Sequence, residues 1–247
     1  VADLVDKQAH YDEVVDRLNE IGVVDEDTGE FAQVTLAEYV GRPRNMGEVT
    51  ALEEDERSAV SVVYVEGAIL DGFGDDGVFV GGDAIAARLR DIRKDEKTKV
   101  VVLRVNSPGG SVTGAEAIRR EVERVRKDGI PVVVSMGSVA ASGGYWVSAR
   151  ADRIFANPET ITGSIGVFGL MPNVKELGNR FGLSWDVVKT APHADVFSFV
   201  RPRTDDEMEQ IQAFVDDIYD RFLGHVSAGR DMNKTSVDKI ARGRVWS

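Results

Sequence analysis

A serine set among very small residues is the first candidate for chemistry in this sequence. Ser142 lies in the run AASGG at 140–144, soon after the apolar stretch Ile130–Val134. Its neighbours have almost no side chain, so a substrate chain could reach the hydroxyl. A serine held on a rigid element after a buried strand is suited to nucleophilic attack on an acyl group. The run therefore predicts a nucleophile at Ser142, although Ala-Ser-Gly-Gly is also typical of a tightly packed helix start.

Two adjacent glycines could complete such a site. Gly109 and Gly110 belong to the stretch NSPGGS at 106–111, between a predicted strand and a predicted helix. Backbone N–H groups at a helix start favour negative charge, and in acyl transfer they can stabilise the tetrahedral oxyanion. The same residues could simply be a Pro-Gly turn. Because both motifs follow successive parallel strands, we expect them at one edge of the sheet.

A serine nucleophile also needs a base, and the residues alone leave its identity open. His193 stands two residues before Asp195, which would allow a Ser–His–Asp site, but a loop histidine beside a proline is commonly a plain surface residue. Lys189, at the end of a predicted strand over Trp185–Lys189, is a second candidate. A solvated lysine would look the same in the sequence.

Composition removes several other functions. There is no cysteine and there are only three histidines, without paired spacing, so we expect no disulfide, no thiolate nucleophile, no metal site and no cofactor. The net charge of −12 argues against a nucleic-acid surface. No apolar run reaches the roughly 18 residues that a membrane-spanning helix needs.

Alternating strands and helices must position these residues. Buried-type strands are predicted over Val60–Val65, Lys99–Val105 and Ile130–Val134, with helices over Ala84–Arg93, capped by Asp83, and over 112–127. This order indicates right-handed crossovers and a parallel sheet covered by helices, which is an α/β fold.

The remaining segments divide the chain. Further helices are predicted over 145–151, 173–181, 205–224 and from 236, with a strand over 152–156. The 205–224 helix should bury an apolar face comprising Met208, Ile211, Phe214, Val215, Ile218, Phe222 and Leu223. Residues 1–56, with an amphipathic helix over 3–21, are expected to be the end of a preceding domain and a linker. Residues 57–247 form the main domain.

Three long motifs carry a family resemblance. NSPGGSVT at 106–113, PVVVSMGSVAASGGYW at 131–146 and ANPETITGSIGVFG at 156–169 together resemble the signal peptide peptidase A family, also called protease IV. The likeness runs from about Val60 to Val245. It implies a serine–lysine membrane peptidase with a ClpP/crotonase-like fold of repeated ββα units. It also implies that Ser142 is the nucleophile, that Gly109, Gly110 and Gly143 surround the oxyanion hole, and that Ser164 orients a catalytic lysine.

The lysine itself is where this sequence departs from short members of the family. In the segment 189–195 the position of the family's base falls on Ala194, and Lys189 matches a different position. Long members place the lysine in one domain and the serine in the next. The chain therefore resembles the serine-bearing, carboxyl-terminal half of a long form, truncated at its own end, with the lysine in an upstream domain. Alone, such a fragment is expected to be inactive.

The resemblance also implies partners and a location. Substrates would be cleaved signal peptides and other hydrophobic peptides, and the assembly a homotetramer that includes the missing amino-terminal half. The catalytic domain would lie on the periplasmic side of the inner membrane, held by an anchor outside this chain. Two alternatives stay open: a crotonase-like acyl-thioester enzyme that uses the same glycines, and an inactive scaffolding repeat.

Overall fold

A computed structural model describes residues 7–8, 33–34, 59–74 and 78–247. These residues divide into two compact units. The first unit comprises the described residues up to Gly166 together with Phe222–Ser247, and the second comprises Val167–Arg221. The predicted domain boundary at residue 56 lies outside the described residues, and so does most of the predicted helix over 3–21. Within that range, Lys7–Gln8 form a short strand instead.

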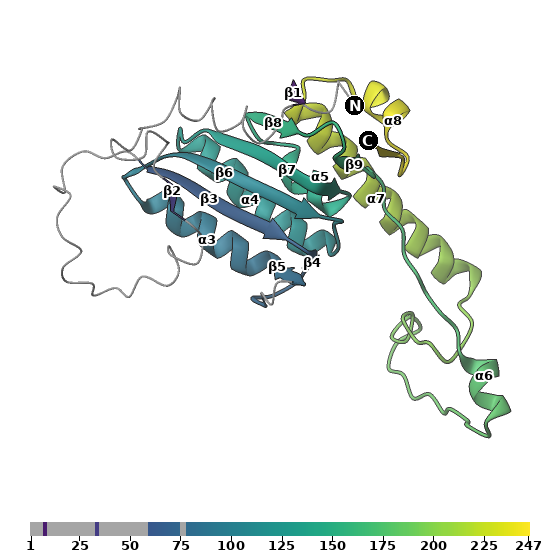
Figure 1. Cartoon of the computed structure of the whole chain (residues 1–247). Coiled ribbons are helices and arrows are strands. Elements are labelled where there is room, and N and C mark those ends of the chain that lie inside the picture. Colours follow the sequence, from purple (N-terminus) through teal and green to yellow (C-terminus); the bar gives the residue numbers. More distant parts are fainter. Residues whose placement is uncertain (1–6, 9–32, 35–58, 75–77) are drawn as a thin grey trace, which may run out of the picture. The chain divides into compact units, whose positions relative to one another are not determined.

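The first unit is built on a mainly parallel sheet (Figure 1). Its strands lie in the order β1–β8–β7–β6–β3–β2, with β9 paired to β7 and β10 paired antiparallel to β9. The strands are β1 (Lys7–Gln8), β2 (Gln33–Val34), β3 (Ala59–Glu66), β6 (Thr98–Ser107), β7 (Val132–Ala141), β8 (Arg153–Ala156), β9 (Ile161–Gly163) and β10 (Val245–Trp246). A separate parallel pair is formed by β4 (Ala68–Leu70) and β5 (Phe79–Gly81).

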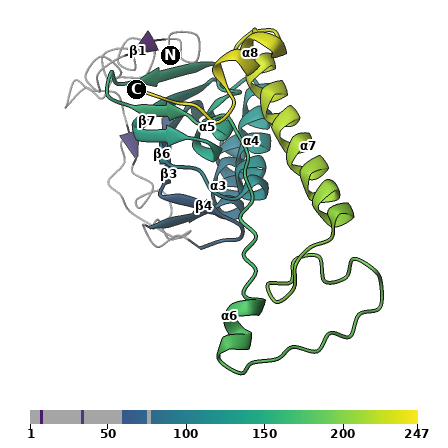
Figure 2. The same ribbon diagram turned by 90° about the vertical axis from the view of Figure 1, so that its right-hand side faces the viewer.

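Helices connect the central strands along the chain and cover one face of the sheet (Figure 2). They are α3 (Gly82–Lys94), α4 (Val112–Lys127) and the short α5 (Gly143–Ser148). Each parallel step from β3 to β6 to β7 to β8 moves to the next strand in the same direction, so right-handed crossovers place all three helices on the same side. The α/β class that the sequence predicts is confirmed.

The alternation of side chains shows which face carries the core. On β3 and β6, Val63, Val65, Val101, Leu103 and Val105 are fully buried. They face the helices, where Ile85 and Leu89 of α3 and Ile118 and Val122 of α4 are also fully buried. The intervening positions form a smaller cluster of Val60, Val100 and Val102, with Val62 and Phe155 partly buried beside it. Valine-rich strands of this kind suit a parallel sheet, since β-branched side chains pack well on a pleated surface.

Strand β7 changes partners along its length. Its first half pairs with β8, from Val133 opposite Arg153 to Ser135 opposite Phe155. Its second half pairs with β9, from Val139 opposite Ile161 to Ala141 opposite Gly163. Against β6 the register shifts between these halves, because Val105 lies opposite Met136 while Ser107 lies opposite Ala140. The sequence predicted only the first part of this strand, Ile130–Val134.

The second unit is mostly irregular. It contains α6 (Lys175–Arg180) and the first part of α7 (Asp205–Gly229), which continues into the first unit. The strand predicted over Trp185–Lys189 is wrong, since these residues have no regular secondary structure and pair with no strand among the described residues. Most of the large apolar side chains that the described residues leave exposed lie in this unit, with Phe168, Leu170 and Val188 at 91%, 85% and 95% exposure.

Two further predictions need correction. Helix α7 buries only the later part of its predicted apolar face: Ile218, Phe222 and Leu223 are buried, while Met208 and Phe214 are exposed. Helix α3 starts two residues earlier than expected, with Gly81 as N-cap. Asp83 lies in its first turn, and its carboxylate accepts a hydrogen bond from the Gly72 amide at 3.0 Å. The last helix, α8 (Lys234–Ile240), lies where the sequence predicts one but begins two residues before the expected start at 236.

Candidate active site

Ser142 stands at a sharp turn between β7 and α5, where the chain changes direction from strand to helix. Its φ of 52° and ψ of −117° lie in a region that L-residues rarely adopt. Such a conformation costs about 1–3 kcal/mol and persists only where the surrounding structure enforces it. The same strand–turn–helix geometry presents the nucleophile of many serine hydrolases, because it exposes the hydroxyl at the edge of the sheet.

Backbone hydrogen bonds hold this turn on both sides. The Ser142 amide donates to the Gly163 carbonyl at 2.9 Å, and the Ser142 carbonyl accepts from the Trp146 amide at 2.8 Å. Within the described ranges no hydrogen bond engages the Ser142 hydroxyl. The hydroxyl is therefore placed by its backbone, and the part of the chain that the structure describes holds no base against it.

The Gly109–Gly110 loop lies directly against this turn. A methyl group on Gly109 would come within 2.5 Å of the Gly143 nitrogen and 2.9 Å of the Ser142 Cβ. One on Gly143 would lie 3.2 Å from the Gly110 nitrogen. The two motifs that are more than 30 residues apart in the sequence are thus in backbone contact, as the strand order predicts. A side chain at Gly109 would therefore clash with this backbone, and one at Gly143 would require its neighbours to shift by a few tenths of an ångström.

The amides around Ser142 differ in their availability. The Gly109 N–H donates to the Ser107 hydroxyl at 3.1 Å and is therefore engaged. Gly143 is the first residue of α5, so its N–H has no acceptor within the helix. An isolated β-bridge joins Gly110 to Ile69, but its two hydrogen bonds run from the Ile69 amide to the Gly109 carbonyl and from the Ser111 amide to the Ile69 carbonyl. The Gly110 amide takes part in neither of them. Within the part of the chain that the structure describes, the Gly110 and Gly143 amides are consequently the two donors beside Ser142 that an oxyanion could use.

Strand β4 holds the glycine loop in place, a feature that the sequence did not reveal. The Ile69 amide donates to the Gly109 carbonyl at 2.9 Å, and the Ser111 amide donates to the Ile69 carbonyl at 2.7 Å. Just beyond the strand, Asp71 accepts hydrogen bonds from the hydroxyls of Thr113, at 2.5 Å, and Ser111, at 2.7 Å. These two bonds lower the pKa of the Asp71 carboxyl, so it is charged at neutral pH.

Ser164 follows directly on the strand that Ser142 bonds to. It has a φ of 48°, and its amide donates to the Arg244 carbonyl at 2.7 Å. Gly163, immediately before it, pairs with Ala141 of β7 and Val245 of β10. The structure thus brings Ser164 to the same edge as Ser142 and the glycine loop. Its predicted role in orienting a lysine stays a prediction.

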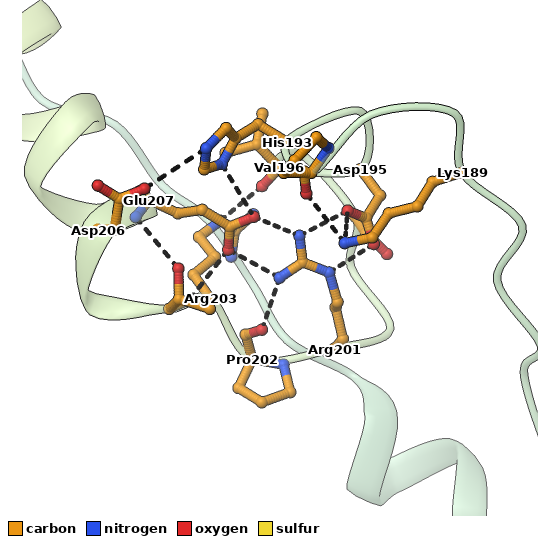
Figure 3. A network of polar contacts seen from close by, with 12 residues as sticks. Lys189, His193, Asp195, Val196, Arg201, Pro202, Arg203, Asp206 and Glu207 are labelled. Carbon is orange, nitrogen blue, oxygen red and sulfur yellow. Dashed lines mark hydrogen bonds and ion pairs between the residues drawn. The ribbon is translucent and has the colours of Figure 1, made fainter.

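The two candidate bases within the chain are engaged elsewhere, in an ion-pair network of the second unit (Figure 3). The Lys189 ammonium donates to the Pro192 carbonyl at 2.9 Å and to the Asp195 carboxylate at 3.1 Å, and its side chain is 41% exposed. A lysine that acts as a base has to be desolvated and free of such a partner. Lys189 has neither property.

His193 does not form the predicted pair with Asp195. Its ring nitrogens lie 3.5 Å from the Asp206 carboxylate and 3.9 Å from that of Glu207. Asp195 is bound instead by Arg201, whose guanidinium lies between the carboxylates of Asp195 and Glu207 (Figure 3). The hydrogen bonds from Arg201 lower the pKa of Asp195 and bring that of Glu207 to about 2. This network ties the loop to the start of α7, and nothing in it resembles a Ser–His–Asp triad.

Other kinds of site have little support. No group of three or more potential metal ligands comes together among the described residues. No helix in the same residues has the length and hydropathy that a membrane span requires. The arrangement that remains is a strained serine beside two amide donors that no acceptor among the described residues engages, and it is suited to acyl transfer.

Comparisons with known proteins bear on this arrangement. The sequence pattern of peptidase family S49 matches residues 124–247. The chain is 47% identical over 187 residues to Protease 4 of Haemophilus influenzae and 44% identical over 193 residues to Protease 4 of Salmonella typhi. These alignments cover 76% and 78% of the chain but only 30% and 31% of the relatives. A chloroplastic serine protease SPPA of Arabidopsis thaliana is 30% identical over 67% of the chain and 25% of its own length.

Proposed function

The chain belongs to peptidase family S49, the family of protease IV and signal peptide peptidase A, and we propose that Ser142 is the nucleophile of its serine peptidase chemistry. The observation that carries this proposal is the conformation of Ser142, strained between β7 and α5 with the Gly110 and Gly143 amides beside it. Strain of this kind is typical of active sites, where it presents a reactive group.

The reaction would proceed through an acyl-enzyme. The Ser142 hydroxyl attacks the scissile carbonyl and gives its proton to a neutral lysine amine, and the carbonyl oxygen becomes an oxyanion. The Gly110 and Gly143 N–H groups donate to that oxyanion, and one such donor contributes roughly 3 kcal/mol to the lowering of the barrier. The lysine ammonium then protonates the leaving amine. Water hydrolyses the ester in the second half-reaction, with the same lysine as base.

The lysine belongs to a different domain in this proposal. Lys189 is held by Asp195, and the chain spans about three tenths of the length of the Protease 4 relatives. We propose that an upstream homologous domain supplies the base, that Ser164 helps to orient it, and that this chain alone is inactive. Mixing this chain with the upstream domain should restore labelling of Ser142 by a fluorophosphonate if the proposal is right.

The substrates we propose are cleaved signal peptides and other hydrophobic peptides at the inner membrane, with the site on the periplasmic side. Apolar side chains flank the strand that holds the glycine loop: Leu70, Phe73, Val78 and Phe79 are 44%, 74%, 64% and 41% exposed. Such a surface suits an apolar chain. A membrane anchor outside this chain belongs to the same proposal.

A homotetramer is the assembly that we propose for the full-length protein. The exposed apolar side chains of the second unit support it, since a soluble surface rarely leaves so many uncovered. Light scattering of the full-length protein measures its mass directly. A monomer would remove this part of the proposal without affecting the assignment of Ser142.

The decisive test, made in the full-length protein, compares Ser142, which directly follows β7, with a serine inside β7. Ser142→Ala should abolish fluorophosphonate labelling and turnover of a hydrophobic peptide ester. Ser138, an exposed serine four residues earlier, provides the matched control, and Ser138→Ala should retain both. Undiminished turnover in Ser142→Ala would refute the nucleophile. A wild-type protein that is never labelled would favour the scaffolding alternative, and coenzyme A binding would favour the acyl-thioester alternative.

A further inference from the structure

A buried tryptophan connects the Ser142 turn to the neighbouring helices. Trp146 is the fourth residue of α5, it is 3% exposed, and its amide closes the first turn of that helix on the Ser142 carbonyl. Its indole N–H donates to a carboxylate oxygen of Glu116 on α4 at 3.0 Å. Trp146 therefore binds the Ser142 turn through its backbone and the charged Glu116 of α4 through its side chain.

Glu116 is itself fixed by a second set of contacts. Arg119, also nearly buried, donates to both oxygens of this carboxylate, at 2.7 and 2.8 Å. Burial by itself would raise the pKa of Glu116, but the hydrogen bonds from Arg119 and Trp146 outweigh it and lower the pKa. The carboxylate is thus charged, and two-point binding by a guanidinium defines its orientation.

The indole also packs on α7. The Trp146 ring lies 4.6 Å from the ring of Phe222 and 5.1 Å from the ring of His225, measured between centroids. The Nε2 atom of His225 is also 3.6 Å from the Glu116 carboxylate. We call Glu116, Arg119, Trp146, Phe222 and His225 the α5 clamp, since they hold α5 between α4 and the last part of α7.

Helix α5 needs such external support. It has only six residues, and a helix of that length is unstable by itself because nucleation is costly. It begins at a serine whose backbone is strained, and strain is maintained only by surrounding contacts. The hydroxyl of Ser148 helps from within by donating to the Gly144 carbonyl at 2.7 Å, but this bond connects α5 only to itself.

We propose that Glu116 and Trp146 are positioning residues: by holding α5 in place, they fix the Ser142 hydroxyl and the Gly143 amide relative to each other and to the glycine loop. Neither residue touches the substrate. The catalytic part of this inference rests on the proposed function of Ser142, whereas the structural part does not. If Trp146 were only a core residue, its indole N–H and the charge of Glu116 would matter for overall stability alone.

The test uses substitutions that remove the polar contact and keep an aromatic ring at 146 and a side chain of the same shape at 116. Trp146→Phe keeps an aromatic ring but has no N–H, and Glu116→Gln keeps the shape but loses the charge. Asp152→Asn is the control, because Asp152 also binds an arginine of α4, Arg126, at 2.8 Å, but it does so at the start of β7, away from Ser142. All three are made in the full-length protein.

Amide hydrogen exchange measures the structural part without any need for activity. Exchange at residues 142–148 should become at least tenfold faster in Trp146→Phe and Glu116→Gln but not in Asp152→Asn. Fluorophosphonate labelling should slow about tenfold in the same two variants, and the peptide ester should show a lower kcat with a similar KM.

The outcomes separate the two claims. Unchanged exchange at 142–148, relative to the control, would overturn the clamp whatever the activity. Faster exchange with unchanged labelling would overturn the positioning role. A wild-type protein without labelling would refute the proposed function, and the exchange measurement would still decide whether the clamp exists.

Discussion

Replacement of Gly109 by alanine provides the sharpest test of how the site is built. Gly109 has a φ of 98°, and a Cβ there would lie 2.5 Å from the Gly143 nitrogen, where ordinary contacts are 3.4–4 Å. Gly129→Ala is a matched control, since Gly129 has a φ of 85° and nothing within 4 Å of its Cβ position. Both substitutions place an L-residue in left-handed backbone, which costs about 1–2 kcal/mol. Alanine also lowers the conformational entropy of the unfolded chain, and this stabilises the folded state by about 0.4–1 kcal/mol and partly offsets the cost.

The difference in free energy of unfolding between the two variants measures only the close contact between the Gly109 position and the Gly143 backbone. A methyl group forced into packed backbone costs roughly 1–3 kcal/mol, so Gly109→Ala should be less stable than Gly129→Ala by about that amount. The methyl group must also push away the Gly143 amide, and the loss of one oxyanion donor slows acyl transfer by about 10²–10³-fold.

Two assays on the full-length protein check these values. Urea denaturation gives the stability difference, and the rate of fluorophosphonate labelling gives the effect on the site. Gly129→Ala should be labelled at the wild-type rate. If Gly109→Ala unfolds at the same midpoint as Gly129→Ala and is labelled equally fast, the contact between the glycine loop and the Ser142 turn is not as described.

Four further predictions concern Ser142 and three residues away from the glycine loop, Glu123, Arg201 and His193. Ser142→Gly should be more stable than Ser142→Ala by about 1 kcal/mol in urea denaturation, because glycine adopts a φ of 52° without strain, yet neither variant should be labelled. The hydrogen bond from Arg119 lowers the pKa of Glu123 to about 2. The contribution of the charged Glu123 to the stability of the folded chain is therefore present above about pH 4.5 and is lost as the pH falls towards 2. In Glu123→Gln the urea midpoint should depend less on pH across this range. Arg201→Ala removes the guanidinium that binds both Asp195 and Glu207, so chymotrypsin should cleave residues 167–221 faster. His193→Ala should leave labelling unchanged.

The sequence predicted the central sheet well because local and tertiary preferences agree there. Valine-rich runs separated by amphipathic helices specify buried parallel strands, and α4 occupies the residues predicted for it. The meeting of Ser142 with Gly109–Gly110 was predictable for the same reason, since the ends of neighbouring parallel strands share one edge.

The failures occur where distant contacts decide. Trp185–Lys189 has a β-type sequence, but no strand among the described residues pairs with it. The first half of α7 has an apolar face that the second unit leaves exposed at Met208 and Phe214. Hydrophobic periodicity indicates which side of a helix will be covered, but it does not indicate by what.

Parts of the site were also beyond a reading of sequence motifs. Asp71 and the clamp residue Glu116 are single acids in ordinary surroundings, and only the fold brings them to Ser111 and Trp146. The assignment of Gly110 and Gly143 as the available donors depends on a hydrogen bond from Gly109 to Ser107. No spacing rule reports which amide of a glycine pair is already engaged.

The change of partners along β7 separates the part of this strand that belongs to the candidate site from the part that belongs to the sheet core, so the site could be exchanged by itself. Residues up to Ser135 pair with β8 and belong to the scaffold, whereas Val139–Ala141 pair with β9 and belong to the site. The two extra residues of β7 at the register shift separate these halves without reversing the alternation of its side chains. A graft that exchanges the glycine loop together with 139–144 and 161–164 would therefore transfer the mutually bonded parts of the site as one cassette and leave the valine core intact.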